Sequence, residues 1–451
     1  MINKNIFRGY DIRGVFGSDL TEKIAFTIGR SFGTKAKKEN KTFVIIGYDN
    51  RESSPILFKG LKEGINSTGV DVLSIGMVTT PMYYFALNKF SAKAGIMITG
   101  SHNPKEYNGF KITFNGIHNA YGDDIVDFRD FTLSGNFING IGSSKEVNIE
   151  DDYVDYLAKD LTISENLKVL VDCGNGASSI IVDKVFSKLN LNYETMYCTP
   201  DSNYPNHHPD PSVYENLKDL QKEVVNRNFD LGIAFDGDAD RVGLVNNEGE
   251  IIPTDHYMIV VIRNIIDKLE DKRFLFDVKC SKALEDEIKK LGGTPIMYRT
   301  GNSYLRAKTH YDDIKFSGEY SGHIFFNDKF YGFDDGIYCG LRMLEIMSET
   351  NLSASKLQEG IEKYYSTEEI KLHVDDDTKF ELIDNIIKYS KEKGYNTLTI
   401  DGCKVMDDDS FALIRASNTG PNITMRFEAK TKEKLNKLQK EFERKIKEET
   451  S

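Results

Sequence analysis

The stretch DLGIAFDGDADRVGL, residues 230–244, places three carboxylates, Asp236, Asp238 and Asp240, directly after an apolar run. Carboxylates this close repel one another unless a cation lies among them. Oxygen ligands alone favour a hard divalent ion such as Mg²⁺ or Ca²⁺. The spacing therefore predicts a divalent-metal site, with a solvated acidic turn as the simpler alternative.

Two known kinds of site also contain alternating aspartates. An EF-hand loop needs glycine at its sixth position and glutamate at its twelfth, but Arg241 and Asn247 stand there. An aspartyl-phosphate phosphatase uses an aspartate after a strand as its nucleophile, and the aspartates alone leave that class open. A candidate serine nucleophile elsewhere in the chain helps to distinguish a metal site from an aspartate nucleophile.

That serine is Ser101, in the segment AGIMITGSHNPKEYNGFK at residues 94–111. Gly100 allows a sharp turn after an apolar strand, and an Asn-Pro pair fixes the next turn, so Ser101 is expected at the end of a sheet strand. The segment lacks the G-x-S-x-G elbow of esterases. His102 adjoins the serine, but neighbouring side chains of an extended chain point to opposite sides, so adjacency does not predict a Ser–His pair. Ser101 is either a nucleophile or a structural turn residue.

A phosphorylated Ser101 and the three aspartates form a self-consistent set. Phosphoserine carries a charge of about −1.5 to −2. Beside three carboxylates such a charge is tolerable only when a metal ion lies between them. The two segments together therefore favour one phosphoserine, one Mg²⁺ and three aspartates.

Two further segments suit a phosphosugar. The turn in RASNTGPNITMR, residues 415–426, combines a cation, hydroxyls, an amide and backbone N–H groups, which suits a phosphate dianion. Its candidate ligands are Arg415, Ser417, Asn418 and Thr419. In SGEYSGH, residues 317–323, Glu319 and Ser321 would share one face of an extended chain and could bind vicinal sugar hydroxyls. A plain polar turn is the alternative in both segments.

Length and charge limit the classes of protein. The 451 residues are about three times a ~150-residue domain, so several domains are expected. A net charge of −12 disfavours a nucleic-acid binder or an anionic-membrane binder. The five cysteines are odd in number and form no C-x-x-C pair, so neither a disulfide framework nor a thiolate zinc site is predicted. Because the sequence shows no signal-like or membrane-spanning apolar run, we expect a cytoplasmic protein.

Short apolar runs alternate with helical patterns over most of the chain, as in βαβ units. The expected strands are 42–46, 70–75, 94–99, 167–172, 192–197, 230–235, 274–278 and 294–297. The expected helices are 55–67, 178–189, 214–226, 281–291 and 335–350. This rhythm predicts three successive α/β units. The last part of the chain lacks it and predicts an α+β domain whose final helix has the apolar stripe Leu435, Leu438, Phe442 and Ile446.

The four motifs, together with FRGYDIRGVFG, NHHPDPSVYENL, FDVKCS and YGFDDGIY, resemble the α-D-phosphohexomutase family in content and order, and most of all its bacterial phosphomannomutase/phosphoglucomutase group. The resemblance implies three similar α/β domains with mixed or parallel sheets and a C-terminal α+β domain around a central cleft. The implied domains are 1–148 with the catalytic serine loop, 149–251 with the metal-binding loop, 252–366 with the sugar-binding loop and 367–451 with the phosphate-binding loop.

By resemblance, Ser101 is the phosphorylated catalytic serine and, with its phosphate, a metal ligand beside Asp236, Asp238 and Asp240. Four more residues are assigned to catalysis: Lys111, His323, Arg241 and Arg13. Of these, Lys111 and then His323 are the candidates for proton transfer to and from the sugar hydroxyls. The implied substrate-binding residues are Tyr10, Lys279, Asn302, Glu319, Ser321, Arg415, Ser417, Asn418 and Thr419.

The implied reaction interconverts hexose 1-phosphate and hexose 6-phosphate, of mannose, glucose or both. It passes through a phosphoserine and a 1,6-bisphosphate, needs Mg²⁺, and uses glucose or mannose 1,6-bisphosphate as activator. Asn302 stands where this group usually has histidine, and Tyr320 stands where glucosamine mutases usually have glutamine. A phosphoglucosamine mutase, a phosphosugar phosphatase and a non-enzymatic divalent-cation-binding module remain alternatives. We expect a monomer or a small homo-oligomer.

Overall fold

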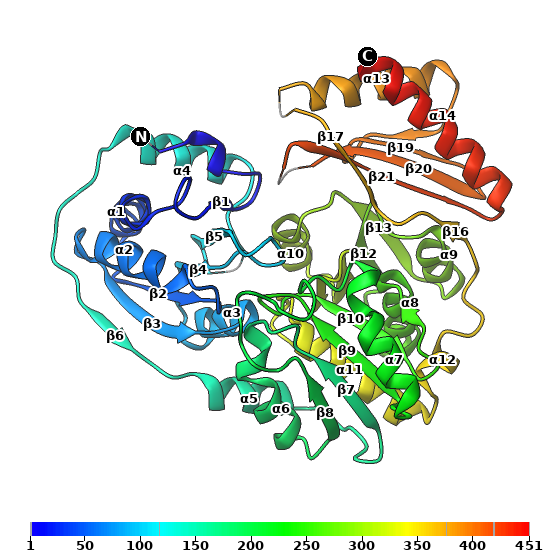
Figure 1. Cartoon of the computed structure of the whole chain (residues 1–451), viewed down its shortest axis with the longest axis horizontal. Helices are drawn as coiled ribbons and strands as arrows, with labels where there is room; N and C mark the ends of the chain where they lie inside the picture. The colour runs from blue at the N-terminus through cyan, green and yellow to red at the C-terminus, as the bar shows by residue number, and fades with distance from the viewer. Residues whose placement is uncertain (1, 117, 376, 418–419, 451) are drawn as a thin grey trace. The chain divides into compact units, whose positions relative to one another are not determined.

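The computed structural model describes residues 2–116, 118–375, 377–417 and 420–450, and its chain divides into two compact units (Figure 1). The first unit comprises residues 1–254, 306–315 and 321–357, and the second comprises 255–305, 316–320 and 358–451. The four domain ranges expected from the sequence stay a prediction beside this division.

The first unit begins with a mixed six-stranded sheet in the order β1-β5-β4-β2-β3-β6. Its strands are β1 (Ile12–Val15), β2 (Phe43–Tyr48), β3 (Asp71–Met77), β4 (Gly95–Ile98), β5 (Tyr107–Thr113) and β6 (Ser144–Glu146). Strand β2 pairs in parallel with β3 and β4, whereas β5 pairs antiparallel with β1 and β4. Because β2 and β4 are parallel neighbours, the residues that follow them leave the sheet at the same edge.

A second mixed sheet of the first unit has the order β11-β10-β9-β7-β8. Its strands are β7 (Lys168–Asp172), β8 (Asn192–Met196), β9 (Leu231–Phe235), β10 (Val242–Asn246) and β11 (Ile251–Ile252), and β15 (Ile324–Phe326) also belongs to this unit. The helices of the unit are α1 (Glu22–Lys38), α2 (Ser54–Asn66), α3 (Thr80–Lys89), α4 (Asp123–Ser134), α5 (Glu150–Ala158), α6 (Val182–Lys188), α7 (Lys218–Asn226), α11 (Gly336–Thr350) and α12 (Ala354–Leu357). Short 3₁₀ turns are η1 (Lys4–Ile6), η2 (Ala177–Ile180) and η3 (Tyr214–Leu217).

In the second unit, β12 (Arg273–Asp277) pairs in parallel with β13 (Thr294–Tyr298) and with β14 (Phe316–Gly318). An antiparallel sheet follows in the order β16-β21-β20-β19-β18, with β17 also paired to β21. Its strands are β16 (Tyr365–Ser366), β17 (Ile370–His373), β18 (Thr397–Leu398), β19 (Cys403–Met406), β20 (Ser410–Ala416) and β21 (Asn422–Ala429). The helices are α8 (Thr254–Ile265), η4 (Ile266–Lys268), α9 (Lys282–Lys290), α10 (Asn302–Tyr311, where the two units divide), α13 (Lys379–Glu392) and α14 (Lys432–Thr450).

These elements confirm the predicted fold class of α/β sheets followed by an α+β part. The expected strands are present within a few residues, and the apolar stripe of the last helix is buried against its sheet. Two expected helices start later than predicted, because the 3₁₀ turns η2 and η3 precede α6 and α7. None of the helices in the described part of the chain is long and apolar enough to cross a membrane.

Candidate active site

Ser101 lies just beyond β4 and is almost completely buried. Its backbone has a φ of +48°, in the left-handed region that side chains other than glycine rarely adopt. The Ser101 hydroxyl donates to Asp236 Oδ2 over 3.0 Å and lies 3.1 Å from His102 Nδ1. The extended-chain argument against a Ser101–His102 contact is therefore wrong, because the left-handed turn brings the two neighbouring side chains together.

Arg51 holds the loop that carries Ser101. Its Nη2 donates to the carbonyl oxygens of Ser101 (2.8 Å) and Asn103 (2.7 Å), and its Nη1 donates to those of Pro104 (2.7 Å) and Tyr107 (2.9 Å). One buried guanidinium thus binds four carbonyl groups of a single loop. The contact is so close that a Cβ atom on the loop glycine before Ser101 would lie 2.4 Å from the guanidinium carbon.

Asp49 completes this support from the same strand end. Its Oδ2 accepts from the Gly100 N–H over 3.1 Å and lies 3.3 Å from Arg51 Nε. Sequence reasoning missed both residues. Their position directly after β2, the parallel neighbour of β4, is the signal that could have identified them.

Asp236, Asp238 and Asp240, here called the aspartate cluster, follow β9 and are completely buried. One carboxylate oxygen from each lies within 4.8 Å of the others. Burial, and then the other two carboxylates, raises the pKa of Asp236 well above its ordinary value. Among the described residues, Oδ1 of Asp238 and Oδ1 of Asp240 find no hydrogen-bond partner. Buried carboxylate oxygens without donors fit a divalent cation.

Lys111, on β5, makes ion pairs with Asp238, at 2.7 Å, and with Asp240. Burial lowers the pKa of Lys111, but the two carboxylates outweigh it and raise the pKa well above the usual lysine value. Burial likewise raises the pKa of Asp238, and the Lys111 ammonium outweighs it in the opposite direction. Thr80, the first residue of α3, donates from its hydroxyl to Asp238 Oδ2 over 2.6 Å. Sequence reasoning did not find Thr80, since nothing around it marks a metal site.

His323 lies between a guanidinium and two carboxylates. Arg241 Nε donates to His323 Nε2 over 3.0 Å, so the ring proton is on Nδ1, which donates to Asp334 Oδ2 over 2.7 Å. The same Nδ1 lies 3.5 Å from Asp240 Oδ1, and the Arg241 N–H donates to Asp236 Oδ1 over 3.1 Å. The structure thus brings His323 and Arg241 to the edge of the aspartate cluster, and it adds Asp334, which sequence reasoning missed.

Arg13 also contacts the serine loop. Its Nη1 donates to Asn103 Oδ1 over 2.7 Å, and its Nη2 pairs with Asp11 at 2.7 Å. Tyr10 lies in a bend before β1 and is partly exposed. In the first unit, Ser101, the aspartate cluster, Lys111, His323 and Arg13 therefore form one buried group, with the half-buried Arg241 at its edge.

Most of the other predicted residues belong to the second unit, whereas Ser321 belongs to the first. Lys279 Nζ lies 3.3 Å from Glu369 Oε2. Burial lowers its pKa, but Glu369 and the nearby Asp277 and Glu319 raise it above the usual value. Glu319 is buried and accepts from the Gly301 N–H.

Asn302 and Ser321 were also predicted to bind substrate. Asn302, the first residue of α10, is buried next to Gly301. Glu319 directly follows β14, and Ser321 lies in the turn that comes next. Their joint contact with sugar hydroxyls stays a prediction.

Two of the predicted phosphate ligands are described: Arg415 lies in β20 and Ser417 directly follows it. Arg415 Nε donates to Asp401 Oδ2 over 2.9 Å, and the same oxygen accepts from the Thr300 N–H over 3.0 Å. Lys379 Nζ donates to the carbonyl oxygens of Ser417 (2.7 Å) and Gly420 (3.1 Å). The remaining predicted ligands, Asn418 and Thr419, lie outside the described residues.

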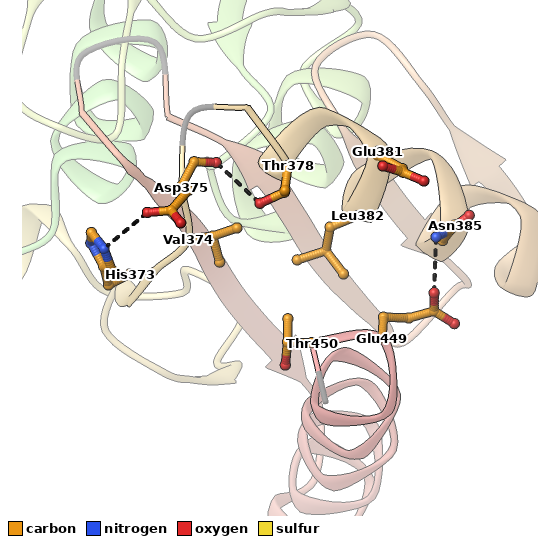
Figure 2. Close-up of a pocket in the computed structure, with 9 residues that line it drawn as sticks. All are labelled: His373, Val374, Asp375, Thr378, Glu381, Leu382, Asn385, Glu449 and Thr450. Atoms are coloured by element: carbon orange, nitrogen blue, oxygen red, sulfur yellow. Dashed lines mark hydrogen bonds and ion pairs between the residues drawn. The ribbon is translucent and has the colours of Figure 1, made fainter.

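A surface pocket of about 500 Å³ lies at the same end of this antiparallel sheet, where His373 of β17 pairs with Asn422 of β21 (Figure 2). It is lined by His373, Val374, Asp375, Thr378, Glu381, Leu382, Asn385, Glu449 and Thr450. Figure 2 shows the His373–Asp375 ion pair at 3.6 Å and the Asn385–Glu449 hydrogen bond at 2.9 Å. None of the predicted site residues lines this pocket, and its three carboxylates would repel a phosphate dianion.

The chain is similar along its length to known proteins. Residues 4–122, 151–249 and 253–364 match, in order, the family models described as phosphoglucomutase/phosphomannomutase alpha/beta/alpha domains I, II and III, and residues 369–445 match the C-terminal domain of that family. A phosphomannomutase/phosphoglucomutase of Pseudomonas aeruginosa is 39% identical over 443 residues, which cover 98% of this chain and 96% of that protein.

Two further comparisons agree. A phosphoglucomutase of Neisseria gonorrhoeae is 36% identical over 445 residues, covering 98% of this chain and 96% of that protein. The crystal structure of a phosphoglucomutase/phosphomannomutase family protein from Burkholderia thailandensis superposes with a TM-score of 0.92 at 37% identity, covering 99% of this chain and 98% of that one.

Proposed function

Since the chain belongs to the phosphoglucomutase/phosphomannomutase family and is a phosphohexomutase, an isomerase of carbohydrate metabolism, we propose that Ser101 carries the transferred phosphoryl group and that the aspartate cluster holds Mg²⁺ beside it. The observation that carries the proposal is the 3.0 Å hydrogen bond from the Ser101 hydroxyl to Asp236, at the edge of three buried carboxylates. A phosphate on that hydroxyl would stand against these charges.

Two carboxylate oxygens that find no hydrogen-bond donor in the described part of the chain, Oδ1 of Asp238 and Oδ1 of Asp240, support a metal at this place. Together with Asp236 and the phosphate on Ser101 they would supply the hard oxygen ligands that Mg²⁺ prefers. Bound Mg²⁺ would neutralise part of the charge on the phosphoryl group during transfer.

In the proposed reaction, phospho-Ser101 donates its phosphoryl group to the free hydroxyl of a hexose 1-phosphate. The P–O bond to the serine breaks, a P–O bond to the sugar forms, and a hexose 1,6-bisphosphate results. The bisphosphate then turns end for end, and Ser101 takes the other phosphoryl group, which leaves hexose 6-phosphate. Glucose or mannose 1,6-bisphosphate added to the enzyme would phosphorylate Ser101 and so act as activator.

The surrounding cations have distinct proposed tasks. Arg241 donates from its backbone N–H to Asp236 and from its side chain to His323, so its guanidinium is held beside the reacting phosphate. Arg13 supports the serine loop through Asn103. Lys111, which carries a proton, and His323 are the proposed proton carriers for the attacking and leaving sugar hydroxyls.

Most of the residues proposed to contact the substrate belong to the second unit, whereas Tyr10 and Ser321 belong to the first. Glu319 and Ser321 would bind sugar hydroxyls, and Arg415, Ser417, Asn418 and Thr419 would bind the phosphate that does not react. Tyr10, Lys279 and Asn302 would line the substrate site. Because Tyr320 stands where glucosamine mutases usually have glutamine, the proposed substrates are mannose and glucose phosphates.

The test is a direct assay of purified enzyme with Mg²⁺, a trace of glucose 1,6-bisphosphate and the 1-phosphates of mannose, glucose and glucosamine. We expect isomerisation of the mannose and glucose compounds without release of inorganic phosphate. Phosphate release without isomerisation would identify a phosphatase, and no turnover would identify a cation-binding module. A higher kcat/KM for the glucosamine compound than for the others would contradict the proposed sugar preference.

A matched pair of variants tests the nucleophile in the same assay. Ser101→Ala should fold normally, lose the phosphate detected by intact-protein mass, and lose nearly all turnover. Ser134→Ala, at an exposed serine, should keep both. Near-normal turnover of Ser101→Ala would refute the assignment of Ser101.

A further inference from the structure

Two cysteines lie beyond the ends of neighbouring strands. Cys173 directly follows β7, and Cys198 stands two residues after the end of β8. The strands are parallel, with Asp172 opposite Met196. The two segments therefore leave the sheet at the same edge, side by side.

Three hydrogen bonds hold these segments together. The Cys173 N–H donates to the Met196 carbonyl over 3.1 Å, and the Asn175 N–H donates to the Tyr197 carbonyl over 2.8 Å. Asn175 Nδ2 also donates to the Thr199 carbonyl over 2.8 Å. Because these bonds lie on both sides of the second cysteine, the local backbone fixes the position of the pair.

The two sulfur atoms lie 2.9 Å apart, with the Cys173 S–H donating to Cys198 Sγ. A disulfide bond is about 2.05 Å long, so an approach of roughly 1 Å would suffice to form one. The remaining cysteines, Cys280, Cys339 and Cys403, contact oxygen atoms instead.

The environment makes the two thiols unequal. The hydrogen bond from Cys173 lowers the pKa of Cys198, which is partly exposed. Burial raises the pKa of Cys173 well above its ordinary value. Since the thiolate is the reactive form, Cys198 is the sulfur that meets an oxidant first, and Cys173 is placed to react with it afterwards.

We propose that Cys173 and Cys198 form a reversible disulfide when a hydroperoxide oxidises the protein. The Cys198 thiolate attacks a peroxide oxygen, the O–O bond breaks, and a sulfenic acid forms as the other oxygen leaves and takes up a proton. Cys173 Sγ then attacks Cys198 Sγ, the S–S bond forms, the S–O bond breaks, and the Cys173 proton leaves with the hydroxide as water. In sum, two thiols and one hydroperoxide give one disulfide, one alcohol (or a water) and one water. A dithiol reductant reverses the step by thiol–disulfide exchange.

The loop that begins at Cys173 reaches the aspartate cluster. The Ala177 N–H donates over 2.9 Å to the carbonyl of Gly237, which stands between Asp236 and Asp238. A disulfide would tie this loop to the end of β8 and would remove conformational freedom from the unfolded chain. The oxidised protein should therefore unfold at a higher temperature than the reduced one. The inference rests on no part of the proposed function.

The test is titration of the purified full-length protein with hydrogen peroxide, alkylation of the remaining thiols, and mass mapping of peptides without reduction. We expect a cross-linked pair of peptides containing Cys173 and Cys198, complete reversal by dithiothreitol, and a Tm several degrees higher for the cross-linked form. Cys198→Ser should give no such cross-link. Cys403→Ser, which removes a buried cysteine from another sheet, should give it as wild type does.

Three results would overturn the proposal. One is a sulfinic acid on Cys198 while Cys173 stays alkylatable, and another is a disulfide between two molecules instead of within one. The third is a cross-link that leaves Tm unchanged, which would show that the bond does not hold the loop. Peptide mapping of the wild-type protein detects either of the first two results directly, so the test does not depend on whether a variant folds.

Discussion

Arg51 donates from Nη2 to the carbonyl oxygen of Ser101 over 2.8 Å, and the same guanidinium binds three more carbonyls of the serine loop. Such a loop has few ways to satisfy its carbonyl groups internally, because Ser101 is in a left-handed conformation. A planar guanidinium can reach several acceptors at fixed angles, whereas an ammonium group offers only a point charge on a flexible chain. Arg51, which is almost completely buried, therefore sets the position of the proposed nucleophile through the backbone of its loop.

The first prediction follows from this geometry. Arg51→Lys should lower kcat on the order of 100-fold, because a displacement of about 1 Å at the reacting hydroxyl has effects of that size. The control is Arg129→Lys, on the surface of α4. Ser101 must also be correctly placed to accept a phosphoryl group. The rate at which glucose 1,6-bisphosphate phosphorylates the enzyme should therefore fall in parallel, and intact-protein mass measures this rate. Normal kcat with a lowered Tm would mean that Arg51 only stabilises the fold.

The main residues of the site could be predicted because local sequence marks them. Ser101 and Asp236 each end an apolar strand, and small residues or a turn follow both. Ser101 follows β4 of one sheet and Asp236 follows β9 of another, so their 3.0 Å contact depends on how the two sheets pack within the first unit, which the local motifs do not predict. Lys111, within the antiparallel strand β5, was assigned by resemblance and reaches Asp238.

The supporting residues could not be predicted in this way. Arg51 binds carbonyl groups, which every residue possesses, so no partner type in the sequence points to it. The contact between Ser101 and His102 depends on one positive φ angle. Asp334 acts on His323 across a turn, and neither its type nor its spacing distinguishes it from the neighbouring Asp335.

The second prediction concerns the counter-charge of the aspartate cluster. Lys111→Met should destabilise the metal-free protein by about 3–5 kcal/mol, because it leaves buried carboxylates without their ammonium partner. Mg²⁺ should then raise the Tm of the variant more than that of wild type, since the metal takes over part of the compensation. Thermal unfolding with EDTA and with Mg²⁺ measures both effects, and the exposed Lys145→Met serves as control. An equal Mg²⁺-induced shift in both proteins would contradict the prediction.

The third prediction assigns Asp334 to the positioning of His323. Asp334→Asn removes the carboxylate that accepts the Nδ1 proton, so the ring loses its fixed orientation and kcat should fall on the order of 10- to 100-fold with little change in KM. If Asp334 acts through the ring, adding Asp334→Asn to His323→Gln should lower kcat no further. Additive losses in the double variant would show a separate structural role, and Asp127→Asn on the exposed side of α4 is the control.

The fourth prediction concerns the proposed phosphate clamp. Arg415→Ala should raise KM on the order of 10-fold or more and change kcat less, because hydrogen bonds to charged groups contribute about 1.5–3 kcal/mol. Arg444→Ala, exposed on α14, should leave both constants unchanged. Steady-state kinetics with glucose 1-phosphate gives the two constants separately. An unchanged KM would remove Arg415 from the substrate site.

The last prediction is a pH dependence of stability that comes from Lys404. This lysine of β19 is buried, donates to the Val278 carbonyl over 2.6 Å and lies 4.1 Å from the centre of the Phe411 ring. Burial lowers its pKa from 10.5 to about 8, with Arg426 acting in the same direction and Glu428 opposing it.

Below pH 8, Lys404 is protonated in both the folded and the unfolded state, and the folded state carries the full cost of the buried charge. Between pH 8 and pH 10.5 the unfolded state binds more protons, so the free energy of unfolding rises with pH by up to about 3 kcal/mol from this group. Lys404→Met should remove that rise. Urea unfolding at several pH values gives the free energy of unfolding of the wild type and of the variant, and the rise is measured as the change with pH in the difference between the two. The variant also leaves the Val278 carbonyl unpaired, but that loss of stability is the same at every pH and does not affect the change. A difference that stays flat across this window would show that the pKa of Lys404 is not lowered in the folded protein.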